Sequence, residues 1–179
     1  MRLPSAQRPL TTSDVASLAA GVRGLDPRAI ARAVRVLEES PPGADALFDA
    51  LAGPPPKSII GITGAPGVGK STLVGRLAHA LRGRGERVGV IAIDPSSPFS
   101  GGAVLGDRLR FSEVTLDADV VVCSLATRGA LGGLSSAVPG ALAVLAAARV
   151  EHVLIETVGV GQDELDGAEL ADTGVVVLV

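Results

Sequence analysis

The chain has 179 residues, of which 47% are hydrophobic, and a formal net charge of −3, so it can bury one substantial core. Basic residues do not concentrate into a nucleic-acid footprint, and no apolar run reaches membrane-spanning length; we therefore expect a cytoplasmic protein with no nucleic-acid and no membrane partner. One cysteine excludes an internal disulfide, and two histidines add no metal-ligand spacing.

The first part of the chain, residues 1–53, is expected to be a short helical extension. Thr11 to Glu39 has the spacing of two amphipathic helices, separated by Gly21 to Gly24. Thr12 or Ser13 can cap the first helix, and Asp26-Pro27 starts the second with proline at its first helical position.

A change in composition marks the end of this extension. A short helix is expected over Ala44 to Leu51, and the run Gly53-Pro54-Pro55-Pro56 predicts a stiff connector. We therefore place a boundary here, between the extension at 1–53 and a second domain at 54–179.

From Ser58 onward, apolar runs alternate with helix-like segments. The predicted strands are Ser58–Thr63, Val88–Asp94, Val120–Leu125, His152–Thr157 and Gly174–Val179, and the predicted helices are Lys70–Arg84, Ser136–Arg149 and Glu164–Ala171. Continuous apolar runs are typical of strands buried on both faces of a parallel sheet. The pattern predicts an α/β, doubly wound, mostly parallel sheet that binds ligands at the carboxyl ends of its strands. Because nothing follows the last strand to cover or continue the sheet, we expect the front part of a longer protein.

The segment Gly64-Ala65-Pro66-Gly67-Val68-Gly69-Lys70-Ser71 fits the phosphate-binding pattern G-x-x-x-x-G-K-[ST] between a predicted strand and a predicted helix. Its glycines let the backbone curl until successive amide groups point at a polyphosphate, and the positive end of the helix points the same way. The alternative is a glycine-rich turn that only joins strand to helix. The context favours a site for a nucleoside di- or triphosphate.

Two side chains of this segment carry distinct chemistry. The chain has fourteen arginines but only two lysines, Lys57 and Lys70. The compact ammonium of Lys70 suits a bridge to the β- and γ-phosphates inside a tight loop, where a planar guanidinium would not fit. The hydroxyl of Ser71 is expected to bind Mg²⁺.

Two aspartates are further candidates for the phosphate site. Asp94 ends a predicted strand, where its carboxylate would contact Mg²⁺ through water or orient the attacking water; alternatively, it only starts a turn before Pro95. Asp107 lies where the following Pro, Ser and Gly-rich stretch returns to helix. It is a candidate for the phosphate site or a helix-start carboxylate.

The segment after the strand His152–Thr157 has the form of a second phosphate-binding element. Glu156 would hold Mg²⁺ through water, and the amide of Gly159 would bind the γ-phosphate. Loss of that phosphate would release Val160 to Asp163, an order-disorder switch. Within it, Gln162 is a candidate for positioning the attacking water.

Four strings of the sequence, ITGAPGVGKSTL, IDPSSPFSGGAVLGDRLR, SLATRGALGGL and IETVGVGQDEL, resemble the MeaB/ArgK family of P-loop GTPases. The resemblance implies a GTP-binding and GTP-hydrolysing chaperone that assists adenosylcobalamin loading and protection of methylmalonyl-CoA mutase. It implies bound GTP or GDP with Mg²⁺, and a partnership with that mutase. By this resemblance the nucleotide loop runs from Gly64 to Thr72, Asp94 and Asp107 are the magnesium and switch acids, and Glu156 is the Walker B acid.

The family's guanine-reading Asn-Lys-x-Asp motif and its C-terminal dimerisation helices are expected beyond residue 179, with a homodimer as the full-length form. Two alternatives remain open. One is a small-molecule, arginine-type P-loop kinase, because a phosphate loop does not choose between water and another acceptor. The other is an inactive fragment that retains the phosphate-binding half without the base-reading half.

Overall fold

The centre of the protein is a five-stranded parallel sheet. The computed structural model describes residues 9–94, 117–126, 133–157 and 170–178. The strands are β1 (Ser58–Gly64), β2 (Val88–Asp94), β3 (Val120–Ala126), β4 (His152–Glu156) and β5 (Thr173–Val177), in the order β3-β2-β4-β1-β5. All four pairings are parallel, which confirms the predicted sheet. Strand β4 lies between β1 and β2, so the elements that follow β1 and β4 meet at one edge of the sheet.

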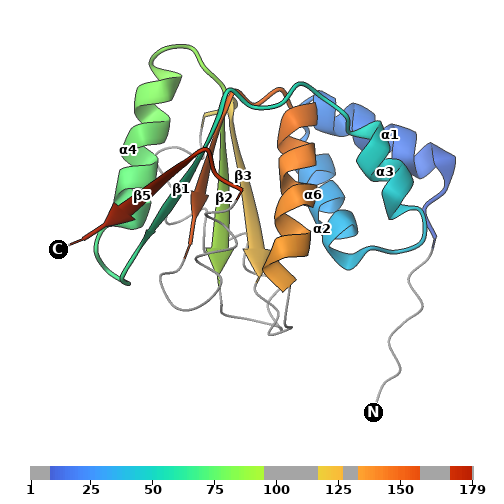
Figure 1. Cartoon of the computed structure of the whole chain (residues 1–179). Coiled ribbons are helices and arrows are strands. Elements are labelled where there is room, and N and C mark those ends of the chain that lie inside the picture. Colours follow the sequence, from blue (N-terminus) through green and yellow to red (C-terminus); the bar gives the residue numbers. More distant parts are fainter. Residues whose placement is uncertain (1–8, 95–116, 127–132, 158–169, 179) are drawn as a thin grey trace.

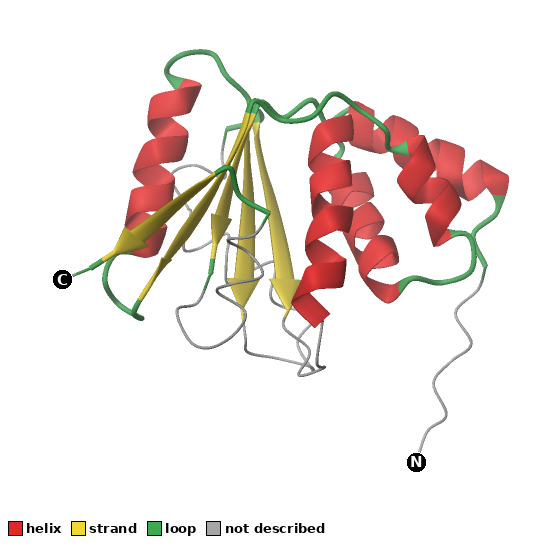
Figure 2. Ribbon diagram, in the orientation of Figure 1, coloured by secondary structure: helices red, strands yellow, loops and turns green. Residues whose placement is uncertain are grey.

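Helices cover both faces of this sheet, as expected for a doubly wound fold (Figure 1). Helix α4 (Lys70–Arg82) lies on one face, and α6 (Gly133–Ala147) lies on the other with the three N-terminal helices beyond it (Figure 2). The strand side chains alternate between two cores. Val88, Val90 and Leu154 pack with α4, whereas Ile91 and Ile155 pack in the larger core on the side of α6.

The N-terminal helices are α1 (Thr12–Arg23), α2 (Pro27–Glu39) and α3 (Ala44–Ala50). The second begins after Asp26 with Pro27 at its first position, as predicted. The predicted cap of the first is wrong: Thr11 is the N-cap. Its hydroxyl accepts from the amide of Asp14, whose carboxylate accepts from the amide of Thr11, so two free amides are satisfied by one reciprocal pair.

The predicted break between the first two helices is also shorter than expected. Helix α1 continues through Gly21 and ends at Arg23. A Cβ atom at Gly21 would lie 2.5 Å from the Cβ atom of Ala29, so this glycine allows α1 and α2 to cross closely rather than ending α1. Side chains of α1, α2 and α3 join α6 and the sheet in one core. The boundary at residue 53 stays a prediction.

The outer strand β5 is much less buried than the central strands. Val176 in β5 is 62% exposed and Leu178, just after the strand, is 82% exposed, whereas Val88, Leu154 and Ile155 are fully buried. The predicted helix Glu164–Ala171 falls mostly outside the described residues, and its last two residues form a turn and irregular backbone. Within the described ranges, no helix combines the length and apolar character needed to cross a membrane.

Candidate nucleotide-phosphate site

The phosphate-binding sequence forms the connection from β1 to α4, at the carboxyl end of the sheet. Gly64, Gly67 and Gly69 have φ angles of 139°, 81° and 97°, a region that side chains disfavour. Around Gly67 and Gly69 there is free space for a Cβ atom, so the backbone conformation alone requires glycine there. At Gly64 a Cβ atom would lie 2.3 Å from the carbonyl oxygen of Val177, so the loop begins in direct backbone contact with β5.

Lys70 is buried at the start of α4, with 6% of its surface exposed. Its Nζ atom donates to the carbonyl oxygens of Gly64 at 2.7 Å and Ala65 at 3.0 Å, so the loop wraps around its ammonium. Within the described part of the chain it has no carboxylate partner. A buried positive charge that is balanced only by carbonyl dipoles is well placed for an anion.

Ser71 and Glu156 meet although 85 residues separate them. Glu156 is opposite Ile62 in the parallel register of β1 and β4, and its side chain points to the face covered by α4. The Ser71 hydroxyl donates to Oε1 of Glu156 at 2.6 Å, and Glu156 is 9% exposed. A hydroxyl and a carboxylate oxygen beside a phosphate loop are the donor types that Mg²⁺ prefers, so these two residues fit the predicted metal.

The remaining predicted residues have different outcomes. Ala65, Pro66 and Val68 form the turn of the loop, where the amide of Val68 donates to the carbonyl of Ala65, and Thr72 lies exposed in the first turn of α4. Asp94 is the last residue of β2, at the carboxyl edge as predicted, with its side chain outside the described set. The predicted residues Asp107, Gly159 and Gln162 lie outside the described residues.

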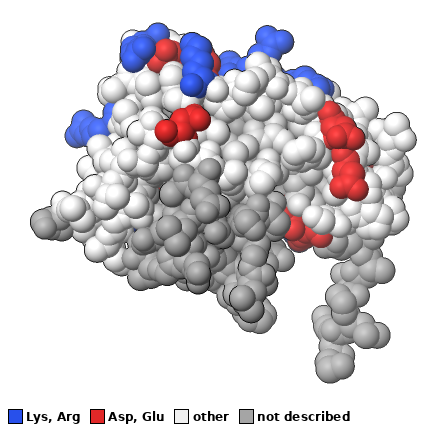
Figure 3. All heavy atoms as spheres, in the orientation of Figure 1, with Lys and Arg blue, Asp and Glu red and all other residues white. Residues whose placement is uncertain are grey.

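Sequence reasoning missed the polar network at the opposite, amino end of the strands. Arg82 donates to Asp117 at 2.9 Å and to Asp119 at 3.0 Å, and Arg87 donates to Asp119 at 2.8 and 3.0 Å. The Arg82 guanidinium holds the pKa of the Asp117 carboxyl below its usual range. Figure 3 shows Lys and Arg side chains gathered along the upper edge of this face, where the strands begin. Short spacings give no signal for these pairs, because they join segments more than thirty residues apart.

The single cysteine has a structural position. Cys123 is 3% exposed on the face of β3 that packs in the larger core, and burial raises the pKa of its thiol to about 12. The thiol therefore stays protonated at neutral pH and behaves as a small apolar side chain.

A parallel sheet whose β1 strand leads through a glycine loop into α4, with an acid on the adjacent β4 strand, defines a P-loop nucleoside-triphosphate-binding fold. The family described as methylmalonyl Co-A mutase-associated GTPase MeaB has a sequence model that matches residues 30–179. The chain belongs to this family.

Relatives in several organisms are similar to this chain over about two thirds or more of its length. A Pyrococcus horikoshii protein named as a GTPase is 52% identical over 121 residues, which are 68% of this chain and 38% of that protein. A Mycobacterium bovis protein, also named as a GTPase, is 40% identical over 167 residues, or 90% of this chain and 50% of its own. The mouse methylmalonic aciduria type A homolog, named as mitochondrial, is 39% identical over 119 residues, covering 66% of this chain and 29% of its own.

A solved structure gives the same fold. The crystal structure of an LAO/AO transport system kinase is similar with a TM-score of 0.69 and 25% identity, over 95% of this chain and 51% of that chain. The chain thus spans about half the length, or less, of these four proteins.

Proposed function

We propose that this chain is the phosphate-binding part of a GTP-hydrolysing chaperone that assists adenosylcobalamin loading and protection of methylmalonyl-CoA mutase. The observation that carries the proposal is the convergence of buried Lys70, Ser71 and Glu156 around one glycine loop, in a chain of this family. The names of the family and of the mouse relative support the link to methylmalonyl-CoA metabolism.

In this proposal the positive groups of the site bind the phosphates, and its oxygen-bearing side chains hold Mg²⁺. The amides of residues 64–72 and the Lys70 ammonium bind the β- and γ-phosphates, and the amino end of α4 adds its positive dipole. Ser71 and Glu156 hold Mg²⁺, with Asp94 and Asp107 as further acids around it. When bound, Mg²⁺ neutralises charge that develops on the phosphates.

Three residues complete the proposed hydrolysis. Asp94 or Gln162 orients the attacking water, and the amide of Gly159 contacts the γ-phosphate, so that loss of this phosphate releases the segment after β4. Guanine specificity and a homodimeric full-length form are part of the proposal by family resemblance.

The structural neighbour's title names a kinase, which keeps one alternative in view: transfer of the γ-phosphoryl group to a small acceptor such as arginine. The deciding experiment incubates the chain, and a full-length form, with γ-labelled GTP, with and without an adenosylcobalamin-dependent methylmalonyl-CoA mutase, and with arginine. We expect labelled inorganic phosphate, which the full-length form should release faster when mutase is present. In other GTPases a partner accelerates hydrolysis by up to about 10⁵-fold.

Labelled phosphoarginine without a mutase effect would replace the chaperone proposal by the kinase. Absence of any nucleotide binding, measured by titration with a fluorescent GTP analogue, would support the inactive fragment. ATP competing as well as GTP in that titration would contradict guanine specificity alone.

A further inference from the structure

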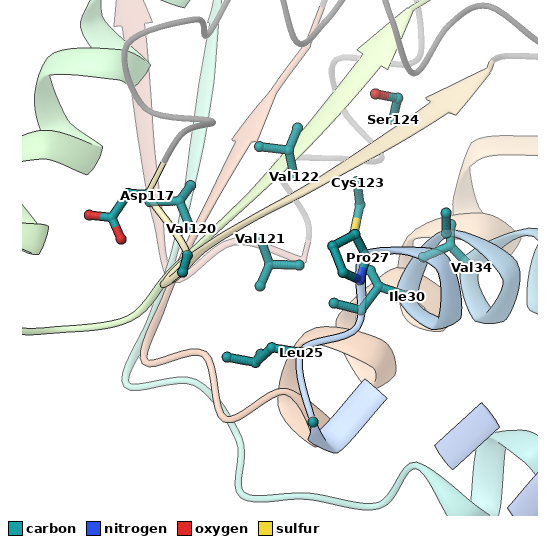
Figure 4. A pocket seen from close by; sticks show the side chains of 13 residues that line it. Leu25, Pro27, Ile30, Val34, Asp117, Val120, Val121, Val122, Cys123 and Ser124 are labelled. Carbon is teal, nitrogen blue, oxygen red and sulfur yellow. The ribbon is translucent and has the colours of Figure 1, made fainter. Parts of the chain in front are cut away.

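A cavity of about 500 Å³ lies between helix α2 and the edge strand β3 (Figure 4). Its lining comes from Leu25, Pro27, Ile30, Ala31, Val34 and the consecutive residues Val120–Ser124. The volume is within the range of ligand sites. The lining side chains are mostly apolar, and Asp117, Ser124 and main-chain atoms add polar surface. The cavity is separate from the proposed phosphate site, because neither the glycine loop nor α4 contributes to it.

The strand side of this cavity is a backbone edge. Strand β3 is the last strand of the sheet, and its only strand partner among the described residues is β2. Five consecutive β3 residues line the cavity, although their side chains alternate between the two faces of the sheet. Their main chain therefore faces the cavity along its whole length. A strand with one neighbour leaves half of its amide and carbonyl groups unpaired, in a row that matches another extended chain.

The helix side supplies an apolar wall with a basic rim. Pro27 and Ala31 are exposed on the cavity side of α2, and Arg28 and Arg32 follow them directly, one step further around the helix toward solvent. Both arginine side chains are without a hydrogen bond or ion pair within the described residues. At the other end of the cavity Asp117 is already paired with Arg82. Among the described residues, the α2 rim of the groove therefore carries the two arginine charges against one carboxylate, that of the N-cap Asp26, and is net positive.

We propose that the groove between α2 and β3 binds an extended peptide segment of a partner protein by strand addition to β3. The segment has small aliphatic side chains that enter the groove, alternating with acidic side chains that reach Arg28 and Arg32. Backbone pairing selects an extended chain over a helix, the roughly five-residue length of the lining sets its size, and the arginine rim selects carboxylates. This inference does not depend on the nucleotide chemistry.

The probe is a five-residue peptide of alternating valine and glutamate, capped at both ends and labelled with fluorescein, titrated with the full chain while anisotropy is measured. We expect saturable binding that weakens about tenfold or more when Arg28→Glu and Arg32→Glu are combined. Arg76→Glu, the same charge reversal on the exposed surface of α4, is the matched control and should leave binding unchanged.

Two further arms separate strand addition from adsorption by charge. Ala31→Trp fills the groove from an exposed helical position and should abolish binding while the thermal unfolding midpoint stays close to that of the parent. Probes N-methylated on alternate amides form two isomers, and only the isomer whose methyl groups face β3 should lose binding.

Equal binding by both methylated isomers, or unchanged binding by both Ala31→Trp and the double arginine variant, would overturn the proposal. So would equally tight binding of an acidic amphipathic helical peptide, or no saturable binding of the extended probe.

Discussion

The two ends of the sheet treat charge in opposite ways. At the amino ends of the strands, Arg82 and Arg87 are matched by Asp117 and Asp119 within hydrogen-bond distance, so folding itself neutralises them. At the carboxyl ends, Lys70 is buried against backbone carbonyls alone. Burying an ammonium without an opposite charge costs folding free energy. The comparison teaches that one end uses its charges to hold the fold, while the other keeps a charge in place for a ligand.

The largest expected effect is the loss of triphosphate affinity when Lys70 is replaced, because among the described residues its buried ammonium has no opposite charge until an anion binds. Lys70→Met keeps most of the side-chain volume and removes the ammonium, so triphosphate affinity should fall on the order of 100-fold, or about 3 kcal/mol. The same variant without nucleotide should be as stable as the parent or more stable, measured by urea unfolding. Lys57→Met, at the amino end, is the control and should bind nucleotide normally. A large loss of ligand-free stability in Lys70→Met would contradict the comparison.

Next in size is the loss of Arg82, which should damage the fold and spare the site. Arg82→Ala leaves Asp117 and Asp119 without a shared partner, so the free energy of unfolding should fall by about 2 kcal/mol. Nucleotide affinity, measured below the unfolding transition, should not change. Reduced affinity with unchanged stability would show that the amino end serves the ligand.

A smaller effect is expected at the oxygen pair beside the loop. Glu156→Gln keeps the shape and an acceptor for Ser71 but removes the negative charge, so affinity in Mg²⁺ should fall about tenfold. Affinity in excess EDTA should be the same as that of the parent. An equal loss under both conditions would assign Glu156 to the loop structure rather than to the metal.

The smallest effect is the acid response of the exposed pair Lys57 and Glu151. The hydrogen bond from Lys57, at 2.6 Å, lowers the pKa of Glu151 below its ordinary value of 4.5. A lowered carboxyl pKa contributes stability above pH 4.5 that is lost as the pH falls through the folded-state value. Lys57→Met should therefore flatten the acid limb of stability against pH below 4.5, and 1 M salt should do the same in the parent. An unaltered acid limb would mean that the pair contributes nothing measurable.

Local patterns made much of the fold and part of the site predictable. The phosphate-loop pattern predicted that Lys70 lies at the start of a helix. The apolar runs predicted all five strands, with bounds that differ from those of the structure by at most two residues. Ser71 and Glu156 could be expected to lie close, because α4 begins and β4 ends at the carboxyl ends of the parallel strands. The partnership of Arg82 with Asp117 and the groove beside β3 depend on strand order and helix packing, which no short spacing encodes. The pattern suggested a helix break at Gly21. This glycine instead allows a close approach to Ala29, a tertiary contact that the sequence pattern does not show.

The contact between Gly64 and the carbonyl of Val177 has a consequence for amide hydrogen exchange. Strand β5 has exposed apolar side chains and a single strand neighbour, so its amides should open at a lower free energy than those of β2 or β4. The first residue of the glycine loop packs on this least protected strand rather than on the centre of the sheet. Opening of β5 would therefore remove the backbone contact between Val177 and Gly64 at the start of the loop. The exchange rates of the amides of Val175 to Val177 should report how often this contact opens.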